Sequence, residues 1–276
     1  ANKKRKNFII WEKKEYKLIE KCINLIKEHH TDTKYKIHHL TYDNIGEYIL
    51  GIPSYLQDLE LAHVADFIRV NVICDYGGIW LDADTLVLEE LDQLFLYLEN
   101  EEDGFFCSNG MNITNAVFGS KSNTALMKEW KSKLRRRLDE KKKNIGIIEI
   151  GTSMLVQFKK NNPELFKNYK IIDGPSTIYP ASWDVSAREY LDAPYENYKS
   201  LIRDFQPCLI LVHDVYEKYE NINCFNQCSL QYFLDKSKKK IRENPQSLIE
   251  NKRSELKKHY NKIIIVVFDF HLLTPF

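Results

Sequence analysis

The first 40 residues alternate between the hydrophobic pattern of strands and that of a helix. Residues 8–11, Phe-Ile-Ile-Trp, form a short apolar run that predicts a buried strand, and residues 35–40 predict a second one. Between them, apolar side chains from Tyr16 to Ile26 recur at helical spacing. This β-α-β order predicts parallel strands joined by a crossover helix.

The rest of the chain continues this mixture of helices and strands. Helices are predicted over residues 59–76, 122–143, 152–160 and 229–260, the last with a break near Pro245, and strands over 79–81, 85–88, 105–108, 116–119 and 208–212. A turn is predicted at 173–176, where Gly and Pro interrupt two short apolar segments. The apolar run 263–273 is too short to span a bilayer, so a buried or edge strand is the better interpretation. A membrane-associating or truncated tail is the alternative.

These elements predict an α/β protein with a mixed central sheet flanked by helices and a helical C-terminal region. No internal repeat or low-complexity linker marks a boundary. We therefore expect one domain over residues 1–225, followed by a helical extension over 226–276 that ends in an apolar strand.

One string in the middle of the chain carries most of the chemical information. The predicted helix 59–76 contains Asp66 and Arg69, which lie three residues apart and so share a helix face. Gly77-Gly78 follows and allows a tight reversal without strain. A short apolar strand then leads directly into Asp82-Ala83-Asp84.

The Asp82/Asp84 pair suits a divalent cation. If the chain continues extended through these residues, both side chains point to the same side. Carboxylate oxygens suit Mg²⁺ or Mn²⁺, and Mg²⁺ commonly takes one or two carboxylates and completes its shell with water and substrate phosphate. The pair beside Arg69 therefore predicts a site for a diphosphate. An isolated Asp-x-Asp triplet often arises by chance, and Asp66 and Arg69 could simply form a structural ion pair.

The string from Asp66 to Asp84 resembles that of sugar transferases related to capsular polysaccharide synthesis proteins and to yeast mannosyltransferases. It also has the spacing found in the clostridial glucosylating toxins. The resemblance covers about residues 7–220 and is strongest over 61–95. It implies a GT-A type fold, a nucleoside diphosphate sugar as donor, with a UDP-sugar favoured over GDP-mannose, and Mn²⁺ or Mg²⁺ as cofactor.

The same resemblance implies roles for the residues of the string. Asp66 and Arg69 match positions that bind the hydroxyls and phosphate of the donor, and a planar guanidinium suits phosphate. Asp84, supported by Asp82, would hold the metal on the leaving diphosphate. Transfer of a hexose with retention of the anomeric configuration follows from the resemblance alone.

Three further residues outside the string match the family. Trp11 would stack on the nucleotide base, or it packs on the following helix. Asn115 belongs to an Asn-Ala pair that borders the sugar site in relatives, although loop asparagines more often serve turns. His213, at the end of a predicted buried strand, would be a further metal ligand, or an ordinary satisfied histidine. Relatives tend to carry Thr-Gly-Pro where this chain has Gly151-Thr152 and no Pro.

The charge and composition of the chain limit the classes of partner that it is expected to bind. The 276 residues contain 40 basic and 39 acidic side chains, so no global field calls for nucleic acid. The basic stretch 131–143 could contact an anionic membrane or a lipid-linked acceptor, although a solvated helix face is more common. We expect a carbohydrate, lipid-linked or protein acceptor, and a cytoplasmic protein or one peripheral to a membrane. The chain begins without Met, so an N-terminal anchor could have been trimmed.

The cysteines point to no metal or disulfide framework. Cys22, Cys74 and Cys208 lie in apolar stretches and are expected to be buried thiols. Cys224 and Cys228 lack a second pair at zinc-finger spacing. Two other functions stay open: a nucleotide-sugar-binding module without turnover, and a metal-dependent nucleotidyltransferase or phosphohydrolase. The sequence contains no P-loop string that would favour phosphate transfer.

Overall fold

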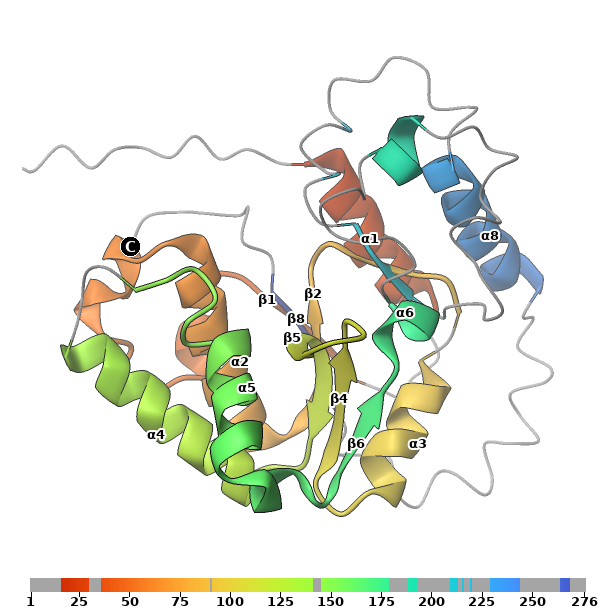
Figure 1. Ribbon diagram of the computed structural model, residues 1–276. Helices are drawn as coiled ribbons and strands as arrows, with labels where there is room; N and C mark the ends of the chain where they lie inside the picture. The colour runs from red at the N-terminus through yellow and green to blue at the C-terminus, as the bar shows by residue number, and fades with distance from the viewer. Residues whose placement is uncertain are drawn as a thin grey trace, which may run out of the picture.

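The computed structural model contains a six-stranded mixed sheet with helices on both faces (Figure 1). It describes residues 16–29, 36–89, 91–140, 145–178, 188–192, 209–212, 215, 219, 229–243 and 264–268. The predicted mixed α/β class is confirmed.

The strands of the main sheet follow an order that differs from their order in the chain. In space they run β1 (Lys36–Leu40), β8 (Ile264–Phe268), β2 (Gly78–Asp82), β5 (Ile113–Ser120), β4 (Gly104–Ser108) and β6 (Tyr169–Ile172). β8 is parallel to both of its neighbours, β1 and β2, whereas β5 is antiparallel to β2 and β4. A second sheet pairs β3 (Thr85–Val87) with β7 (Leu209–Leu211).

Seven α-helices are described around these sheets. They are α1 (Lys17–His29), α2 (Leu61–Tyr76), α3 (Asp92–Asn100), α4 (Ala125–Glu140), α5 (Thr152–Asn161), the single turn α6 (Gly174–Thr177) and α8 (Ser229–Glu243). Short 3-10 segments lie at Ile45–Glu47, Ser54–Asp58 and Pro163–Phe166, and a π-helical turn lies at Arg188–Asp192. Within the described residues, no helix combines the length and the apolar character needed to cross a bilayer.

Alternating side chains of the sheet feed two different cores. Trp80, Phe106 and Phe118 pack with α2, α4 and α5, whereas Ile79 and Phe105 pack with α1 and α3. This alternation is the period-two pattern of a sheet buried on both faces. Figure 1 shows α2, α4 and α5 grouped on one side of the strands and α3 on the other. A third core joins α1 and α8 next to β3.

The turn between α2 and β2 confirms the role expected of the two glycines. Gly77 and Gly78 have φ values of 72° and 113°, which favour glycine over any L side chain. The N–H of Gly77 donates to the carbonyl of Ile73 and closes the helix. A Cβ on Gly77 would lie 2.8 Å from the backbone nitrogen of Ser122. The glycines therefore allow a buried helix to turn straight into a buried strand.

Most predicted elements lie within a few residues of the observed ones, with one difference in detail. A turn is predicted at 173–176, whereas Gly174–Thr177 forms one helical turn with Pro175 in its first positions. The C-terminal apolar run forms β8 between β1 and β2, so the predicted strand is confirmed, and of its two predicted placements the edge position is excluded. The boundary at residue 225 stays a prediction, and the strand predicted at residues 8–11 lies outside the described residues.

Candidate functional site

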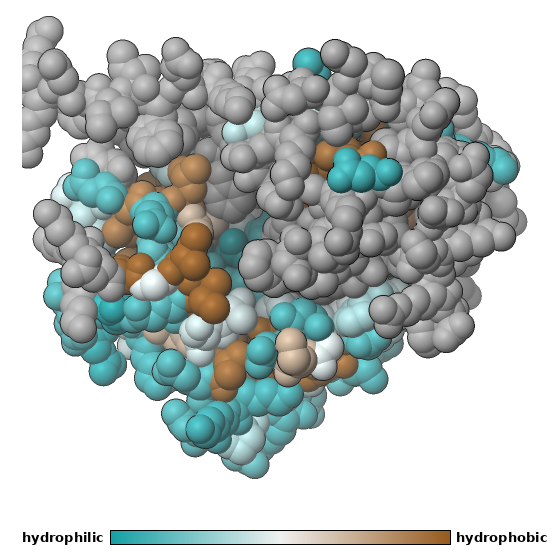
Figure 2. Space-filling model, turned by 45° about the horizontal axis from the view of Figure 1, so that its top comes forward, coloured by the Kyte–Doolittle hydropathy of each residue, from teal (hydrophilic) through white to brown (hydrophobic). Residues whose placement is uncertain are grey.

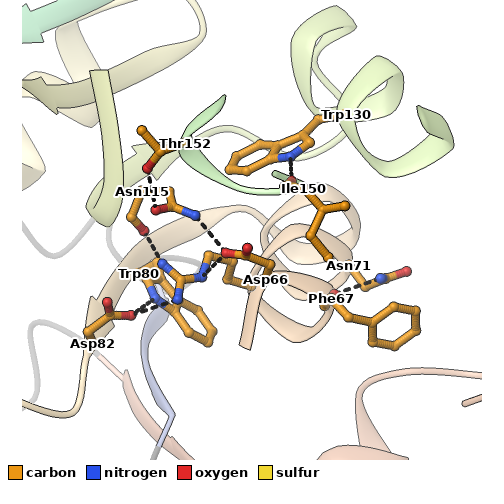
Figure 3. A network of polar contacts seen from close by, with 10 residues as sticks. Asp66, Phe67, Asn71, Trp80, Asp82, Asn115, Trp130, Ile150 and Thr152 are labelled. Atoms are coloured by element: carbon orange, nitrogen blue, oxygen red, sulfur yellow. Dashed lines mark hydrogen bonds and ion pairs between the residues drawn. The ribbon is translucent and has the colours of Figure 1, made fainter. Parts of the chain in front are cut away.

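The polar cluster at the carboxyl end of β2 is assembled from three elements of the fold. α2 supplies Asp66 and Arg69, β2 ends at Asp82, and Asn115 lies in β5, the antiparallel neighbour of β2. Figure 3 shows the labelled side chains of Asp66, Asp82, Asn115 and Thr152 converging on one place. The structure thus brings together four of the predicted site residues, Asp66, Arg69, Asp82 and Asn115.

Arg69 is the centre of this cluster. Its Nε lies 3.4 Å from Oδ1 of Asp66, and its Nη2 lies 3.2 Å from Oδ1 of Asp82. Its Nη1 donates to the backbone oxygen of Asn115 at 2.6 Å. Since Arg69 is only 5% exposed, these charge-assisted contacts are shielded from bulk water. The guanidinium therefore sets the positions of two carboxylates relative to one another.

The indole of Trp80 fixes Asp82 from the other side. Its Nε1 donates to Oδ1 of Asp82 at 2.7 Å, and the guanidinium carbon of Arg69 lies 5.3 Å from the centre of its ring. Trp80 and Asp82 belong to β2 and are two positions apart, so their side chains leave the same face of the strand. Oδ1 of Asp82 thus receives an indole N–H and an ion pair.

A second line of contacts orients Asp66. Nδ2 of Asn115 donates to Oδ1 of Asp66 at 2.7 Å, and the hydroxyl of Thr152 donates to Oδ1 of Asn115 at 3.1 Å. A Cβ on Gly151 would lie 2.5 Å from Oδ2 of Asp66 and from Nδ2 of Asn115. Only a glycine at residue 151 lets the start of α5 approach the carboxylate this closely.

Burial makes Asp66 a weaker acid than usual. Desolvation raises its pKa, and the Arg69 cation, the Asn115 hydrogen bond and the nearby His63 oppose that rise without cancelling it. Two carboxylates share one guanidinium here. A cationic or proton-donating ligand would therefore be favoured in this cluster.

Asp84 occupies a different backbone setting from the one expected. β2 ends at Asp82, and residues 83–84 form a turn into β3, so the assumption of a continuous extended segment is wrong. The extended backbone ends at Asp82 because the chain leaves the main sheet at this point. It continues as β3, which pairs with β7 in the second sheet. The same-side argument from strand periodicity no longer applies to the pair. The Asp84 side chain is half-buried, and its backbone oxygen accepts the N–H of Val212 at 3.0 Å.

The donor chemistry of Asp82 and Asp84 fits a divalent cation, since both offer hard oxygen ligands. Within the described part of the chain, no group of three or more His, Cys, Asp or Glu side chains is placed to hold a metal ion. Remaining positions would then fall to water, to donor phosphates or to a residue elsewhere in the chain. His213, the third predicted ligand, and Trp11, the predicted base-stacking residue, both lie outside the described residues.

Sequence reasoning missed part of the network. Gly151 and Thr152 match the family only in part, and the sequence predicts Trp80 only as an apolar strand residue. A usable signal was present for Trp80, because an indole two residues before a strand-end Asp shares its face. No local signal connects Gly151 with Asp66, which is 85 positions away in the sequence.

The buried thiols are as expected where the structure describes them. Cys22 and Cys74 are buried and form no disulfide, and the same holds for Cys107. Burial raises the pKa of the Cys22 thiol, which disfavours the nucleophilic thiolate form. Cys208, Cys224 and Cys228 lie outside the described residues.

Comparison with known proteins gives one family match. Residues 2–265 match the model of a family described as capsular polysaccharide synthesis protein. Among solved structures, the chain is similar to the glycosyltransferase GlyE of Streptococcus pneumoniae TIGR4, with 15% sequence identity and a TM-score of 0.45. That similarity covers 89% of this chain and 62% of the other, so this chain spans less than two thirds of that protein. No curated protein matches this chain.

Proposed function

This chain belongs to the family of capsular polysaccharide synthesis proteins, and on that premise we propose that it is a glycosyltransferase of the GT-A type. It would move a hexose from a nucleoside diphosphate sugar to an acceptor hydroxyl. The observation that carries the proposal is the buried Asp66–Arg69–Asp82 cluster at the carboxyl end of β2, where ligands gather in α/β sheets.

The two aspartates of the Asp-x-Asp string would hold the leaving group. Asp84 and Asp82 are the proposed ligands of Mn²⁺ or Mg²⁺, and the bound ion would neutralise charge on the departing diphosphate. Asp82 is already oriented by Trp80 and Arg69, so it enters the site without a large loss of side-chain freedom. This support of a ligand by its neighbours is typical of preorganised sites.

Asp66 and Asn115 are the proposed contacts of the donor sugar. Their amide and carboxylate groups hold one another at 2.7 Å, and Thr152 fixes the amide orientation. The guanidinium of Arg69 is already engaged by Asp66, Asp82 and the backbone oxygen of Asn115, so it would contact the donor phosphates while it keeps these partners. Its main contribution, in this proposal, is to align the two carboxylates.

The bond broken would join the anomeric carbon to the diphosphate oxygen, and the bond formed would join that carbon to the acceptor oxygen. The transition state should resemble an oxocarbenium ion, as in glycoside hydrolysis. We propose a retaining, front-face route in which the leaving diphosphate accepts the acceptor proton. The working basis for this stereochemistry is the family resemblance.

The test is a donor panel of UDP-glucose, UDP-galactose and GDP-mannose with Mn²⁺, followed by analysis of the released products. Release of a nucleoside diphosphate, with Asp84→Asn inactive but folded, supports the proposal. Release of a nucleoside monophosphate or pyrophosphate would instead support a nucleotidyltransferase or phosphohydrolase. Thermal stabilisation by a donor without any product would point to a binding module. No donor effect at all, or full activity in Asp84→Asn, would contradict the proposal.

A further inference from the structure

Residues 145–151 form a loop that leads into α5 and reaches the site at Gly151. At that end it lies against Asp66 and Asn115, closely enough that any larger residue at 151 would collide with them. Thr152, the next residue, contacts Asn115. The position of this loop therefore affects the groups proposed to bind the donor sugar.

Side chains of α4 hold the loop at Glu149 and Ile150, next to Gly151. Arg137 forms an ion pair with Glu149, whose Oε2 accepts the backbone N–H of Gly146 at 2.9 Å. Nε1 of Trp130 donates to the carbonyl of Ile150 at 2.8 Å, as Figure 3 shows. These contacts fix the loop to α4, which carries none of the proposed site residues.

His63 holds the other end of the loop from the helix that carries the site. Its Nε2 lies 3.0 Å from the carbonyl oxygen of Gly146, and the side chain is only 3% exposed. Because a carbonyl only accepts, Nε2 must carry the proton. His63 lies one helical turn before Asp66, so both side chains leave the same face of α2.

We propose that His63 is a positioning residue for the donor site, because its hydrogen bond to Gly146 fixes the 145–151 loop directly to the helix that carries Asp66 and Arg69. This inference rests on the proposed function. The loop then presents Gly151 to Asp66 at a set distance, and Asn115 keeps the orientation in which it contacts Asp66. His63 itself touches neither donor nor acceptor in this proposal.

Loss of the contact should weaken donor binding more than it slows transfer. A loosened loop leaves Asn115 and Asp66 poorly ordered in the free protein, and ordering them again costs binding energy in the ground and transition states alike. We expect the KM for the donor to rise roughly fivefold, the equivalent of one ordinary hydrogen bond, with kcat within about twofold.

Two substitutions separate the hydrogen bond from the volume of the side chain. His63→Phe keeps a ring of similar size and removes the donor, whereas His63→Gln places an amide N–H near the position of Nε2. We expect His63→Phe to raise the donor KM and His63→Gln to restore it. If His63→Phe does not fold, His63→Asn takes its place, since its amide is one methylene too short to reach Gly146.

Hydrogen exchange of the loop gives a readout that does not require turnover. The amides of Gly146, Glu149 and Ser153 donate to acceptors within or next to the loop, so they should exchange faster in His63→Phe and normally in His63→Gln. A wild-type KM in His63→Phe, or equal exchange in all variants, would overturn the inference. If the wild type releases no nucleotide from any donor, the proposed function fails, and faster loop exchange in His63→Phe would then show a loop contact without a donor role.

Discussion

Arg69 is buried and forms ion pairs with two carboxylates, those of Asp66 and Asp82. Its guanidinium contacts Asp66, Asp82 and the backbone of Asn115, so three separate elements depend on one side chain. An ion pair of this kind is expensive to build in a protein interior, and it is more expensive to break on one side only. The cluster therefore links α2, β2 and β5 to one another and is also the proposed site.

Removal of the Arg69 charge should destabilise the protein strongly. In Arg69→Met, both aspartates stay buried without their cation, and we expect the free energy of unfolding to fall by about 3–5 kcal/mol. Urea unfolding measures this change. Lys167→Met is the control, because its pair with Glu164 at 3.5 Å is exposed and should be worth at most about 1 kcal/mol. Equal losses in the two variants would contradict the assignment.

The raised pKa of Asp66 predicts a pH dependence of definite sign. The native state keeps the Asp66 proton to higher pH than the unfolded chain, because burial raises the pKa of this carboxyl. Above the unfolded-state pKa, near 4, the unfolded chain binds fewer protons, so the stability of the wild type falls as pH rises through the window up to the native pKa.

The comparison that isolates this effect is the wild type against Asp66→Asn. We expect the difference in free energy of unfolding between them to move in favour of Asp66→Asn as the pH rises above about 4. Thermal or urea unfolding at several pH values gives the curve. Parallel pH profiles, or a wild type that gains relative stability with rising pH, would show that Asp66 is an ordinary ionised carboxylate in the native state.

At the scale of elements, the site depends on close approach between segments that sequence separates. α2 and β2 are joined by a two-glycine turn, but β5 and the start of α5 arrive from later in the chain. Gly151 precedes α5 directly, and a Cβ there would lie 2.5 Å from Oδ2 of Asp66. The room for a side chain at residue 151 is therefore limited by the packing of α5 against α2 and β5, and not by α5 alone.

Gly151→Ala should disturb this contact. The added methyl would lie 2.5 Å from Oδ2 of Asp66 and from Nδ2 of Asn115. Asp66 is buried and hydrogen-bonded to Asn115, so these two groups cannot easily move away. We expect a loss of about 1–3 kcal/mol in the free energy of unfolding, as for other overpacked sites. Gly46→Ala is the matched control, since a Cβ there meets no atom within 4 Å. A Gly151→Ala protein as stable as Gly46→Ala would mean that α5 can withdraw from the site freely.

At the scale of the whole molecule, the first and the last described strands of the chain lie side by side in one sheet. β8 lies between β1 and β2, although its first residue, Ile264, is 182 positions after Asp82. The strand that ends at Asp82 therefore pairs on one side with the last described segment of the chain. Pairing over such a distance has a large loop-closure cost, and folding should be slow and require nearly the full chain.

Proline in β8 tests this arrangement. Val266→Pro removes a backbone N–H from a strand paired on both sides, and we expect a loss of about 3 kcal/mol or more or failure to fold. Lys36→Pro provides the comparison, because it lies at the first residue of the edge strand β1 and should cost much less. Solubility and unfolding midpoints report both effects. A well-folded Val266→Pro protein would argue against a central β8.

Local patterns in the sequence determined the elements and the chemistry of this protein. Helix and strand periods, the two glycines and the acidic string depend on neighbours within a few residues, so they can be read without the fold. The same patterns predicted the mixed α/β class and the proximity of Asp66, Arg69 and Asp82, whereas Asn115 was predicted only from the family resemblance. The turn at residues 83–84 was not predicted, because it depends on β3 leaving the main sheet to pair with β7.

Only the tertiary structure decided which distant groups meet. It placed Gly151 against Asp66, His63 against Gly146, and β8 between β1 and β2. These contacts depend on how helices and strands pack across many intervening residues, and a pattern of period 2 or 3.6 carries no information about partners at that range. The sequence therefore determined what kinds of groups the site contains, and the packing of the sheet and its helices decided how they hold one another.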